Sequence, residues 1–245
     1  MKPIAVIPAR GGSKRIPGKN IIDFCGKPMI AWTIEEAIKS NCFSRIIVST
    51  DCHKIAAISE RYGAEVPFLR TEGADDFSAV SVATLWTIEK LFDGAVEDST
   101  NVIQLMANTP LRGYKTIVRF AEKLIELGGS SLISCFETKF GAPNWAIQMD
   151  SSTSLGRFVF NSAKTQRSQD LVRYLMPTGS IWGANFKNLK ANNSFYSDNF
   201  NVFEMSWLEA LDIDTPEELE ICESLSKSLL SDRFGNSTSL FNCRD

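Results

Sequence analysis

The stretch PIAVIPARGGSKRIPGKN, residues 3–20, decides the fold of this 245-residue chain. Its first six residues are mostly apolar, which predicts a short buried strand over 3–8. Residues 9–20 contain three glycines and four cations, and they precede an amphipathic segment, 29–39, that predicts a helix. A buried strand, a glycine-rich loop and a helix in this order are typical of an α/β domain that binds a ligand at the loop.

Strand-like and helix-like segments continue to alternate beyond this stretch. The expected strands are 45–50, 66–69, 101–106, 131–136 and 201–205, and the expected helices are 54–62, 78–92, 114–127 and 216–230. Strands that alternate with helices of this length predict a mostly parallel sheet flanked by helices on both faces. Such a sheet binds ligands at the carboxyl ends of its strands, where the loops 9–20, 70–81 and 107–112 lie.

The alternation breaks in residues 140–178, which are polar and irregular. We expect this segment to form an inserted arm or small subdomain within a single domain of residues 1–230. The strand-like pattern returns at 179–185. Residues 231–245 are polar and show no period, so we expect a flexible tail there.

The overall composition narrows the classes of function. A hydrophobic share of 44% excludes a disordered chain, and no stretch approaches the roughly 20 apolar residues of a membrane span. The apolar run at the N-terminus is too short for the core of a signal peptide, so we expect a cytoplasmic protein that binds no membrane. The net charge of −3 argues against a nucleic-acid partner, since such proteins usually carry a basic face.

The cysteines and the histidine argue against several kinds of site. The six cysteines are scattered and include no C-x-x-C pair, so neither a zinc ribbon nor a disulfide framework is expected. The only histidine, His53, begins a predicted helix, and a histidine-rich metal site is therefore excluded. Any chemistry is left to carboxylates, cations and backbone amides.

The loop 9–20 concentrates positive charge in a chain that is negative overall. Gly11 and Gly12 allow backbone amides to turn towards an anion without a side chain in the way, and Ser13 adds a hydroxyl donor. The cations of the loop are Arg10, Lys14, Arg15 and Lys19. The composition predicts a phosphate-binding loop, with a solvated basic loop as the alternative.

Two common phosphate-binding patterns do not fit this loop. The Walker pattern has four residues between its first glycine and the Gly-Lys pair, whereas five separate Gly12 from Gly18. Lys19 is then followed by Asn20 instead of Ser or Thr. The dinucleotide pattern G-x-G-x-x-G is absent as well. The loop therefore belongs to another class.

Several motifs follow one another along the chain. They are IPARGGSKRIPGKN (7–20) with FCGKPMI (24–30), IIVSTD (46–51), PLR (110–112), RSQDL (167–171) and DIDT (212–215). In this order they resemble the acylneuraminate cytidylyltransferases, also called CMP-sialic acid synthetases, which include pseudaminic and legionaminic acid members. The resemblance covers roughly residues 3–225.

The resemblance implies a Rossmann-like nucleotidyltransferase fold and a homodimer whose inserted arm reaches the partner's site. It also implies magnesium-dependent transfer of CMP from CTP to the anomeric hydroxyl of a nonulosonic acid, with release of pyrophosphate. Two alternatives stay open: a 3-deoxy-manno-octulosonate cytidylyltransferase, which shares the fold, and a catalytically idle nucleotide-binding homologue. Gly11-Gly12 and Lys19-Asn20 favour the sialic type.

The resemblance assigns site residues on the nucleotide side. Arg10, Lys19 and Asp212 are the implied catalytic residues, and Arg15 is expected to face solvent. Asp51, at the end of a predicted strand, is explained by capping of the next helix. The implied nucleotide-binding residues are Arg10, Gly11, Gly12, Ser13, Lys14 and Lys19 at the triphosphate, and Asn20, Arg70, Ser78 and Ser81 at the base.

Asp212 and Asp214 are the candidate magnesium ligands. In an extended segment, side chains two residues apart point the same way, so both carboxylates can reach one cation. Two carboxylates together with phosphate oxygens and water are how magnesium is usually held beside a nucleotide. The alternative is that Asp214 caps the helix that follows Thr215.

On the sugar side the resemblance points to Met106, Arg167 and Trp182. Arg167 suits a sugar carboxylate, because a guanidinium binds two oxygens at once; a salt bridge within the arm is the alternative. Met106 stands where many sialic members have Gln, and Trp182 where Tyr is common. These departures make a modified acid of the pseudaminic or legionaminic type as plausible an acceptor as N-acetylneuraminic acid.

Overall fold

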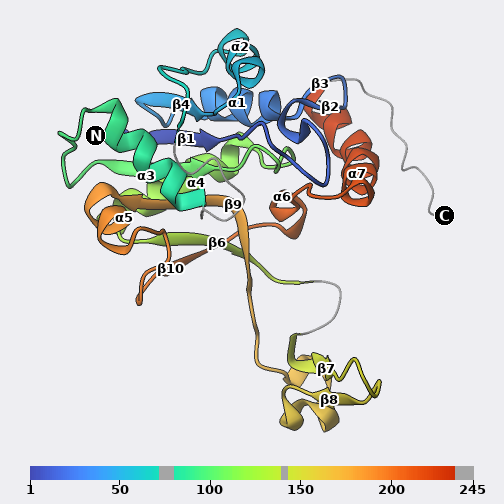
Figure 1. Ribbon diagram of the computed structural model, residues 1–245. Coiled ribbons are helices and arrows are strands. Elements are labelled where there is room, and N and C mark those ends of the chain that lie inside the picture. The colour runs from blue at the N-terminus through green and yellow to red at the C-terminus, as the bar shows by residue number, and fades with distance from the viewer. Residues whose placement is uncertain (72–79, 139–142, 235–245) are drawn as a thin grey trace.

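A six-stranded sheet lies at the centre of the computed structural model, which describes residues 1–71, 80–138 and 143–234 (Figure 1). The strand order is β10-β6-β9-β5-β1-β4. β9 runs antiparallel to both of its neighbours, and the other pairs are parallel, which confirms the expected mostly parallel sheet. The strands are β1 (Ile4–Pro8), β4 (Arg45–Ser49), β5 (Asn101–Leu105), β6 (Leu132–Phe136), β9 (Met176–Asn185) and β10 (Asn201–Glu204).

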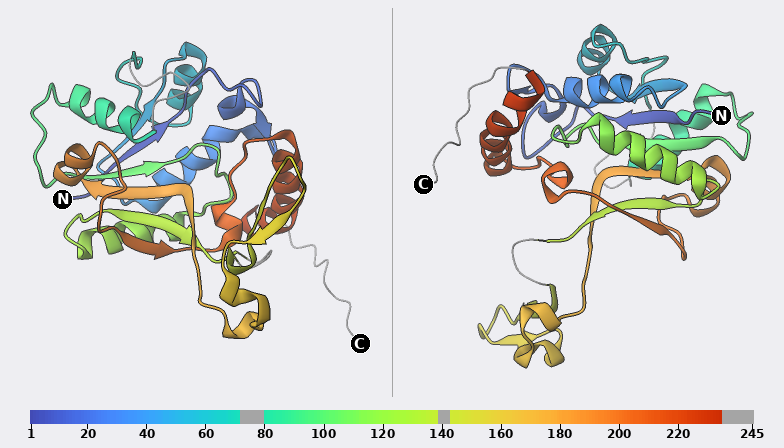
Figure 2. Two further views of the ribbon diagram at one scale, coloured as in Figure 1. Left: turned by 60° about the horizontal axis from the view of Figure 1, so that its bottom comes forward. Right: turned by 180° about the vertical axis from the view of Figure 1, so that it is seen from behind.

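Helices cover both faces of this sheet, as Figure 2 shows. β1 is buried along its whole length, because Ala5 and Ile7 pack in one hydrophobic cluster while Ile4 and Val6 pack in another on the opposite face. The first cluster includes residues of α1 (Met29–Ser40), α2 (His53–Arg61) and α4 (Tyr114–Glu126); the second includes residues of α3 (Val80–Leu91) and α5 (Phe186–Asn192). These two hydrophobic clusters fix β1 within the sheet, with its carboxyl end at the side where the other parallel strands also end.

The strand expected at 66–69 does not form. Only Glu65 pairs with the edge strand β4, through its amide to the Ile46 carbonyl and its carbonyl to the Val48 amide. Pro67 has no backbone N–H to continue such a ladder, so the chain leaves the sheet edge there. It returns at Arg70, whose amide donates to the Thr50 carbonyl.

The final part of the chain contains three helices. The sequence did not indicate α5 or α6 (Trp207–Ala210), which are short. α5 begins where the Asn185 side chain accepts a hydrogen bond from the Asn188 amide. α7 (Pro216–Phe234) continues four residues beyond its expected end at 230. No helix in the described part of the chain is both long and apolar enough to cross a membrane.

The segment expected to be an arm forms a small lobe that stands apart from the sheet (Figures 1 and 2). Its antiparallel pair β7–β8 is the only sheet within the described residues of the lobe. The chain returns from the lobe to the central sheet through β9. The described elements of the lobe are η2 (Pro143–Trp145), β7 (Ile147–Met149), β8 (Gly156–Phe158), η3 (Asn161–Thr165) and η4 (Ser168–Asp170).

Candidate functional site

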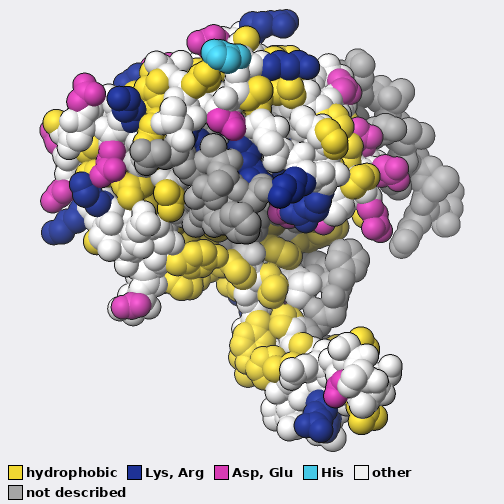
Figure 3. Space-filling view, in the orientation of Figure 1, with side chains coloured by type: hydrophobic (Ala, Val, Ile, Leu, Met, Phe, Trp, Pro, Cys, Tyr) yellow, Lys and Arg dark blue, Asp and Glu magenta, His cyan; other side chains and the backbone are white. Residues whose placement is uncertain are grey.

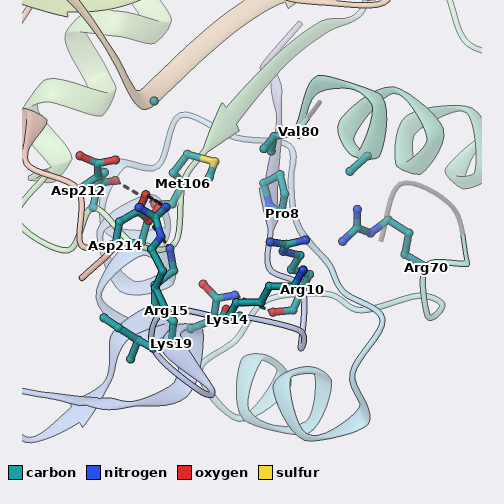
Figure 4. Close-up of a pocket in the computed structure, with 17 residues that line it drawn as sticks. Pro8, Arg10, Lys14, Arg15, Lys19, Arg70, Val80, Met106, Asp212 and Asp214 are labelled. Carbon is teal, nitrogen blue, oxygen red and sulfur yellow. Dashed lines mark hydrogen bonds and ion pairs between the residues drawn. The ribbon is translucent and has the colours of Figure 1, made fainter. Parts of the chain in front are cut away.

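A cavity of about 520 Å³ opens at the carboxyl ends of β1 and β5 (Figure 4). Pro8 ends β1 and Met106 directly follows β5, and both line the cavity. This is the edge at which parallel sheets bind ligands. The predicted site residues that line it are Arg10, Ser13, Lys14, Lys19, Asn20, Arg70, Met106, Asp212 and Asp214.

Two side chains hold the glycine-rich loop in place. Asp51 accepts a hydrogen bond of 2.8 Å from the Gly11 amide, and Asn20 donates one of 3.0 Å to the Arg10 carbonyl. The helix cap expected of Asp51 is wrong, because α2 is preceded by Cys52 and has no side-chain cap hydrogen bond. A Cβ on Gly11 would lie 3.0 Å from that of Cys52, so any larger residue there would require the Cys52 segment to shift.

Gly11 therefore serves the packing of the loop, whereas a Cβ on Gly12 would meet nothing within 4 Å. Neither Gly11 nor Gly12 lines the cavity, and the Gly11 amide is engaged by Asp51. Among the described glycines of this loop, the left-handed backbone occurs at Gly18, with φ of 65°. Gly18 precedes η1 (Lys19–Ile21) and turns the chain so that Lys19 reaches the cavity.

The predicted base-contact residues are placed differently from one another. Arg70 is buried and points into the cavity beside Arg10, as Figure 4 shows. Asn20 is buried at the cavity wall, with its amide nitrogen given to the loop. Ser81 is buried within α3 and does not line the cavity, although its neighbours Val80 and Ala83 do. Ser78 lies outside the described residues.

The carboxylate of Asp214 is the centre of an ionic cluster. Lys19 Nζ lies 2.6 Å from its Oδ1, and Arg15 Nη2 lies 2.5 Å from its Oδ2. Asn108 Nδ2 donates to Oδ1 at 3.2 Å. Most of the Arg15 side chain is exposed, as expected, but its guanidinium also lines the cavity and pairs with Asp214.

Two hydrogen bonds between Asn108 and Ile213 hold the segment that contains both aspartates at the ends of the strands. The Ile213 amide donates to the Asn108 carbonyl at 2.9 Å, and Asn108 Nδ2 donates to the Ile213 carbonyl at 3.3 Å. The Ile213 side chain is fully buried, so Asp212 and Asp214 on either side of it both face the cavity. Thr215 and Glu218 cap α7 reciprocally, which leaves Asp214 free of the capping role.

The two aspartates differ in their electrostatic setting. Burial, followed by the charges of Asp214 and Glu218, raises the pKa of Asp212. Burial also acts to raise the pKa of Asp214, but the hydrogen bond and charge of Lys19 and the charge of Arg15 outweigh it and hold that pKa below its usual range. Asp214 is thus the more strongly stabilised anion.

The aspartate pair fits a magnesium ion that completes its shell from a nucleotide. Both groups are hard oxygen ligands at one cavity wall, and Asp214 is close enough to raise the pKa of Asp212. No group of three or more His, Cys, Asp or Glu side chains suited to a metal occurs in the described part of the chain. Phosphate oxygens and water would have to supply the remaining ligands.

Only one of the three predicted sugar-side residues lines the cavity. Met106 does, and its sulfur accepts a contact of 3.8 Å from Gln104 Nε2. Trp182 instead packs against Phe195, with its indole N–H donating to the Thr178 carbonyl at 2.7 Å. Arg167 lies in the lobe and pairs with Asp170 at 2.8 Å.

Arg112 is a buried residue whose role the sequence did not assign, although it ends the quoted motif at 110–112. Its guanidinium donates to the Thr109 hydroxyl at 2.8 Å, to the Ser180 carbonyl and to the Thr33 hydroxyl at 3.2 Å. Burial lowers its pKa to about 9, against the opposing charges of Glu209 and Glu36, so it remains charged at neutral pH. Arg112 thereby ties the loop after β5 to β9 and α1 beneath the cavity.

Several named enzymes are similar to the chain over about nine tenths of its length. It is 32% identical to a pseudaminic acid cytidylyltransferase of Campylobacter jejuni subsp. jejuni, over 93% of this chain and 97% of that protein. It is 36% identical to a CMP-N,N'-diacetyllegionaminic acid synthase of Legionella pneumophila subsp. pneumophila, over 92% and 96%. An N-acylneuraminate cytidylyltransferase of Streptococcus agalactiae is 30% identical over 89% of this chain, but only 52% of that longer protein is covered.

Solved structures support the fold. A CMP:2-keto-3-deoxy-manno-octonic acid synthetase in complex with CTP superposes with a TM-score of 0.70 at 20% identity, covering 94% of this chain and 100% of that one. A 4-diphosphocytidyl-2C-methyl-D-erythritol synthase of Anaerococcus prevotii gives 0.59 at 15% identity, covering 92% and 99%. These likenesses show the nucleotidyltransferase fold alone.

The motifs, the fold and the relatives lead to one family. A sequence profile described as cytidylyltransferase matches residues 4–232, almost the whole described chain. The cationic loop and the aspartate pair meet in one cavity at the strand ends. The chain therefore belongs to the cytidylyltransferase family.

Proposed function

We propose that this protein is a magnesium-dependent cytidylyltransferase that transfers CMP from CTP to the anomeric hydroxyl of a nonulosonic acid and releases pyrophosphate. The observation that carries the proposal is the meeting of opposite charges in one cavity. Arg10, Lys14 and Lys19 come from the loop after β1, and Asp212 and Asp214 come from the segment before α7. Cations for a triphosphate and carboxylates for its metal are the two requirements of nucleotidyl transfer.

The nucleotide side accounts for binding of CTP. Arg10, Lys14 and Lys19 would hold the triphosphate, with Ser13 as a hydroxyl donor, since all four line the cavity. Arg70 would meet the cytosine, because its buried guanidinium points into the same space. Asn20 would act on the base through its carbonyl oxygen or through the loop that it anchors.

The reaction forms a bond between the anomeric oxygen of the sugar and the α-phosphorus of CTP. The bond from that phosphorus to the pyrophosphate oxygen breaks, and the hydroxyl proton passes to water. Lys19 and Arg10 would offset the negative charge that grows on the leaving pyrophosphate. Asp212 and Asp214 would hold the magnesium ion, which when bound polarises the α-phosphate.

The acceptor is proposed to be a nonulosonic acid of the pseudaminic or legionaminic type. The relatives with these names match the chain over nearly their whole length, whereas the N-acylneuraminate enzyme does so over half of its own. Met106 at the cavity wall has no hydrogen-bond donor, so it favours an acceptor group that is apolar at this point. An eight-carbon octulosonate is the weaker alternative, because the structure named for it is only 20% identical.

A homodimer is proposed from the surface of the lobe. Arg167 belongs to the lobe and does not line the cavity of its own chain, and it would then reach the partner's sugar site. Figure 3 shows apolar side chains on the lobe and on the strand that leads to it. The exposed apolar side chains of this part of the chain include Ile147, Met149, Leu155, Val159 and Val172.

Because CTP is made in the cytoplasm, the protein is proposed to act there.

The test is pyrophosphate release from CTP and magnesium with a panel of sugars. The panel contains pseudaminic, legionaminic, N-acetylneuraminic and 3-deoxy-manno-octulosonic acids. Release with pseudaminic or legionaminic acid is the expected result. Release with the octulosonate alone would overturn the acceptor class, and CTP binding without release from any of the four sugars would favour the idle homologue. Sedimentation of the same protein gives its oligomeric state.

A further inference from the structure

Both oxygens of the Asp214 carboxylate are occupied by cationic or amide donors. Oδ1 receives Lys19 and Asn108, and Oδ2 receives Arg15 (Figure 4). The ion pair with Lys19 is well sheltered, since 18% of the lysine side chain and 27% of that of Asp214 are exposed. A divalent cation at Asp214 would have to share these oxygens with both cationic side chains or displace them.

The charge of the cluster also opposes a metal that arrives alone. Two cations, Arg15 and Lys19, face the two aspartates, so the charges of these four groups cancel. A divalent cation at Asp214 would lie within a few ångströms of both positive groups and would be repelled by them. The aspartate pair is thus a poor metal site in the nucleotide-free protein.

A triphosphate changes this balance from within the same cavity. Arg15 and Lys19 both line the space where Arg10 and Lys14 end, so phosphate oxygens there compete with Asp214 for them. A guanidinium matches two phosphate oxygens as well as it matches a carboxylate, and the triphosphate carries more charge. Once the two cations turn to the phosphates, Asp214 is left half-buried beside Asp212, and a divalent cation would neutralise the pair.

We propose that Arg15 is a triphosphate-binding residue which, together with Lys19, holds Asp214 in the nucleotide-free protein, so that the divalent-cation site opens only after CTP has bound. The inference rests on the proposed function, from which it takes the nucleotide and the metal. It adds a role for Arg15 and an order of binding. Asp214 is held before CTP binds and released to the metal afterwards.

The first test measures Mn²⁺ binding by the nucleotide-free protein, with the electron paramagnetic resonance signal of free Mn²⁺ as the readout. R15A is expected to bind Mn²⁺ at least about fivefold more tightly than the unchanged protein, because one of the two repelling cations is gone. D214N in the R15A background should abolish the gain. R45A is the matched control, because Arg45 forms a similar 2.5 Å pair with Glu65 away from the cavity, and it should change nothing.

The second test measures CTP binding by calorimetry in the presence of EDTA. R15A should weaken CTP binding at least about threefold, as expected for the loss of one charge contact to phosphate, while R45A should not. An R15A protein with unchanged Mn²⁺ affinity overturns the holding of Asp214, and one with unchanged CTP affinity overturns the phosphate role of Arg15.

These outcomes are separable from a failure of the proposed function. If the unchanged protein binds CTP and releases pyrophosphate but R15A leaves both affinities unaltered, only the present inference fails. If the unchanged protein binds no CTP with or without magnesium, the proposed function fails and the inference with it. Tight Mn²⁺ binding by the unchanged protein without nucleotide also overturns the inference.

Discussion

The two sides of the cavity differ in how the chain supplies their residues. On the nucleotide side, one continuous segment from the loop after β1 to the first residue of η1 supplies Arg10, Ser13, Lys14, Arg15 and Lys19. On the other side, Met106 follows β5 and Gly179 belongs to β9, which lie next to each other only because the sheet pairs them antiparallel. Neighbours in sequence supply the cations of this loop, and neighbours in the sheet form the second side.

The two sides also differ in polarity. The nucleotide side is a network of ion pairs that meets at Asp214. At Met106 the wall is a thioether backed by the amide of Gln104, which in turn accepts a hydrogen bond from Thr84. Charge is therefore concentrated where phosphate would bind. Recognition of the acceptor depends on the shape of the cavity and on a few neutral groups. This difference predicts which substitutions affect catalysis in general and which affect the choice of sugar.

The largest effect is expected from the aspartate pair. D212A or D214A should lower the rate of pyrophosphate release at least about a hundredfold, because each removes a charged oxygen from the metal site and from the reacting centre. E65Q is the control, since Glu65 also forms a carboxylate ion pair but lies away from the cavity. Near-normal turnover by both aspartate variants would remove the metal assignment.

A smaller loss is expected at the lysine of the loop. K19A should reduce kcat at least about tenfold, the usual scale for losing one charge contact to a developing anion. K190A removes a lysine that pairs with Glu89 at 3.0 Å on the surface and serves as the comparison. Equal rates for the two variants would mean that the loop does not contact the triphosphate. The cationic side of the cavity could then no longer be assigned to the nucleotide.

The acceptor side should respond selectively. M106Q is expected to change the KM for the sugar by up to about tenfold while leaving the KM for CTP unchanged, because a single neutral hydrogen bond is gained or misplaced there. The measurement is the pair of KM values with the best acceptor from the panel. An equal shift in both constants would show that Met106 acts on the nucleotide as well.

The smallest effect concerns stability and its dependence on pH. The lowered pKa of Asp214 means that its charge stabilises the fold at neutral pH, and this contribution is lost as the pH falls through that lowered value. The raised pKa of Asp212 means the reverse: its charge costs stability above the raised value, and the cost disappears below the ordinary pKa of about 4.

At pH 7, D214N should therefore lower the Tm and D212N should raise it, each by about 2 °C. The D212N difference should have nearly vanished at about pH 4, whereas the D214N difference should begin to shrink near that pH and disappear only as the pH falls through the lowered pKa of Asp214. Thermal unfolding followed by circular dichroism across this range checks both signs. Shifts of the same sign for the two variants would contradict the assigned environments.

Local patterns predicted much of the framework. The strands of the parallel core and helices α1, α2, α3 and α4 follow from apolar periodicity, because both faces of the sheet and one face of each helix must be buried. The expected strand at 66–69 failed because Pro67 interrupts the pairing after Glu65. The helix α5 was missed because a short segment contains too few turns to show a period.

The candidate site divides in the same way. The phosphate-binding character of the loop 9–20 could be predicted, because its glycines and cations lie close together in sequence and their charge does not depend on where the loop is placed. Trp182 was placed on the sugar side by motif alignment, yet in the structure it packs against Phe195 and lines no part of the cavity. Asp51 was expected to serve its own helix, but its carboxylate binds Gly11 instead.

By itself, the sequence determined the kind of fold, the family and the charge of the phosphate-binding loop, because burial patterns and short motifs depend on residues near one another in the chain. Only the tertiary structure decided which groups meet. Lys19 and Asp214 are 195 residues apart, and they come within 2.6 Å because Asn108 clasps the backbone of Ile213 at the end of β5. Contacts between such distant residues depend on how the packed elements place them, and no local pattern records that.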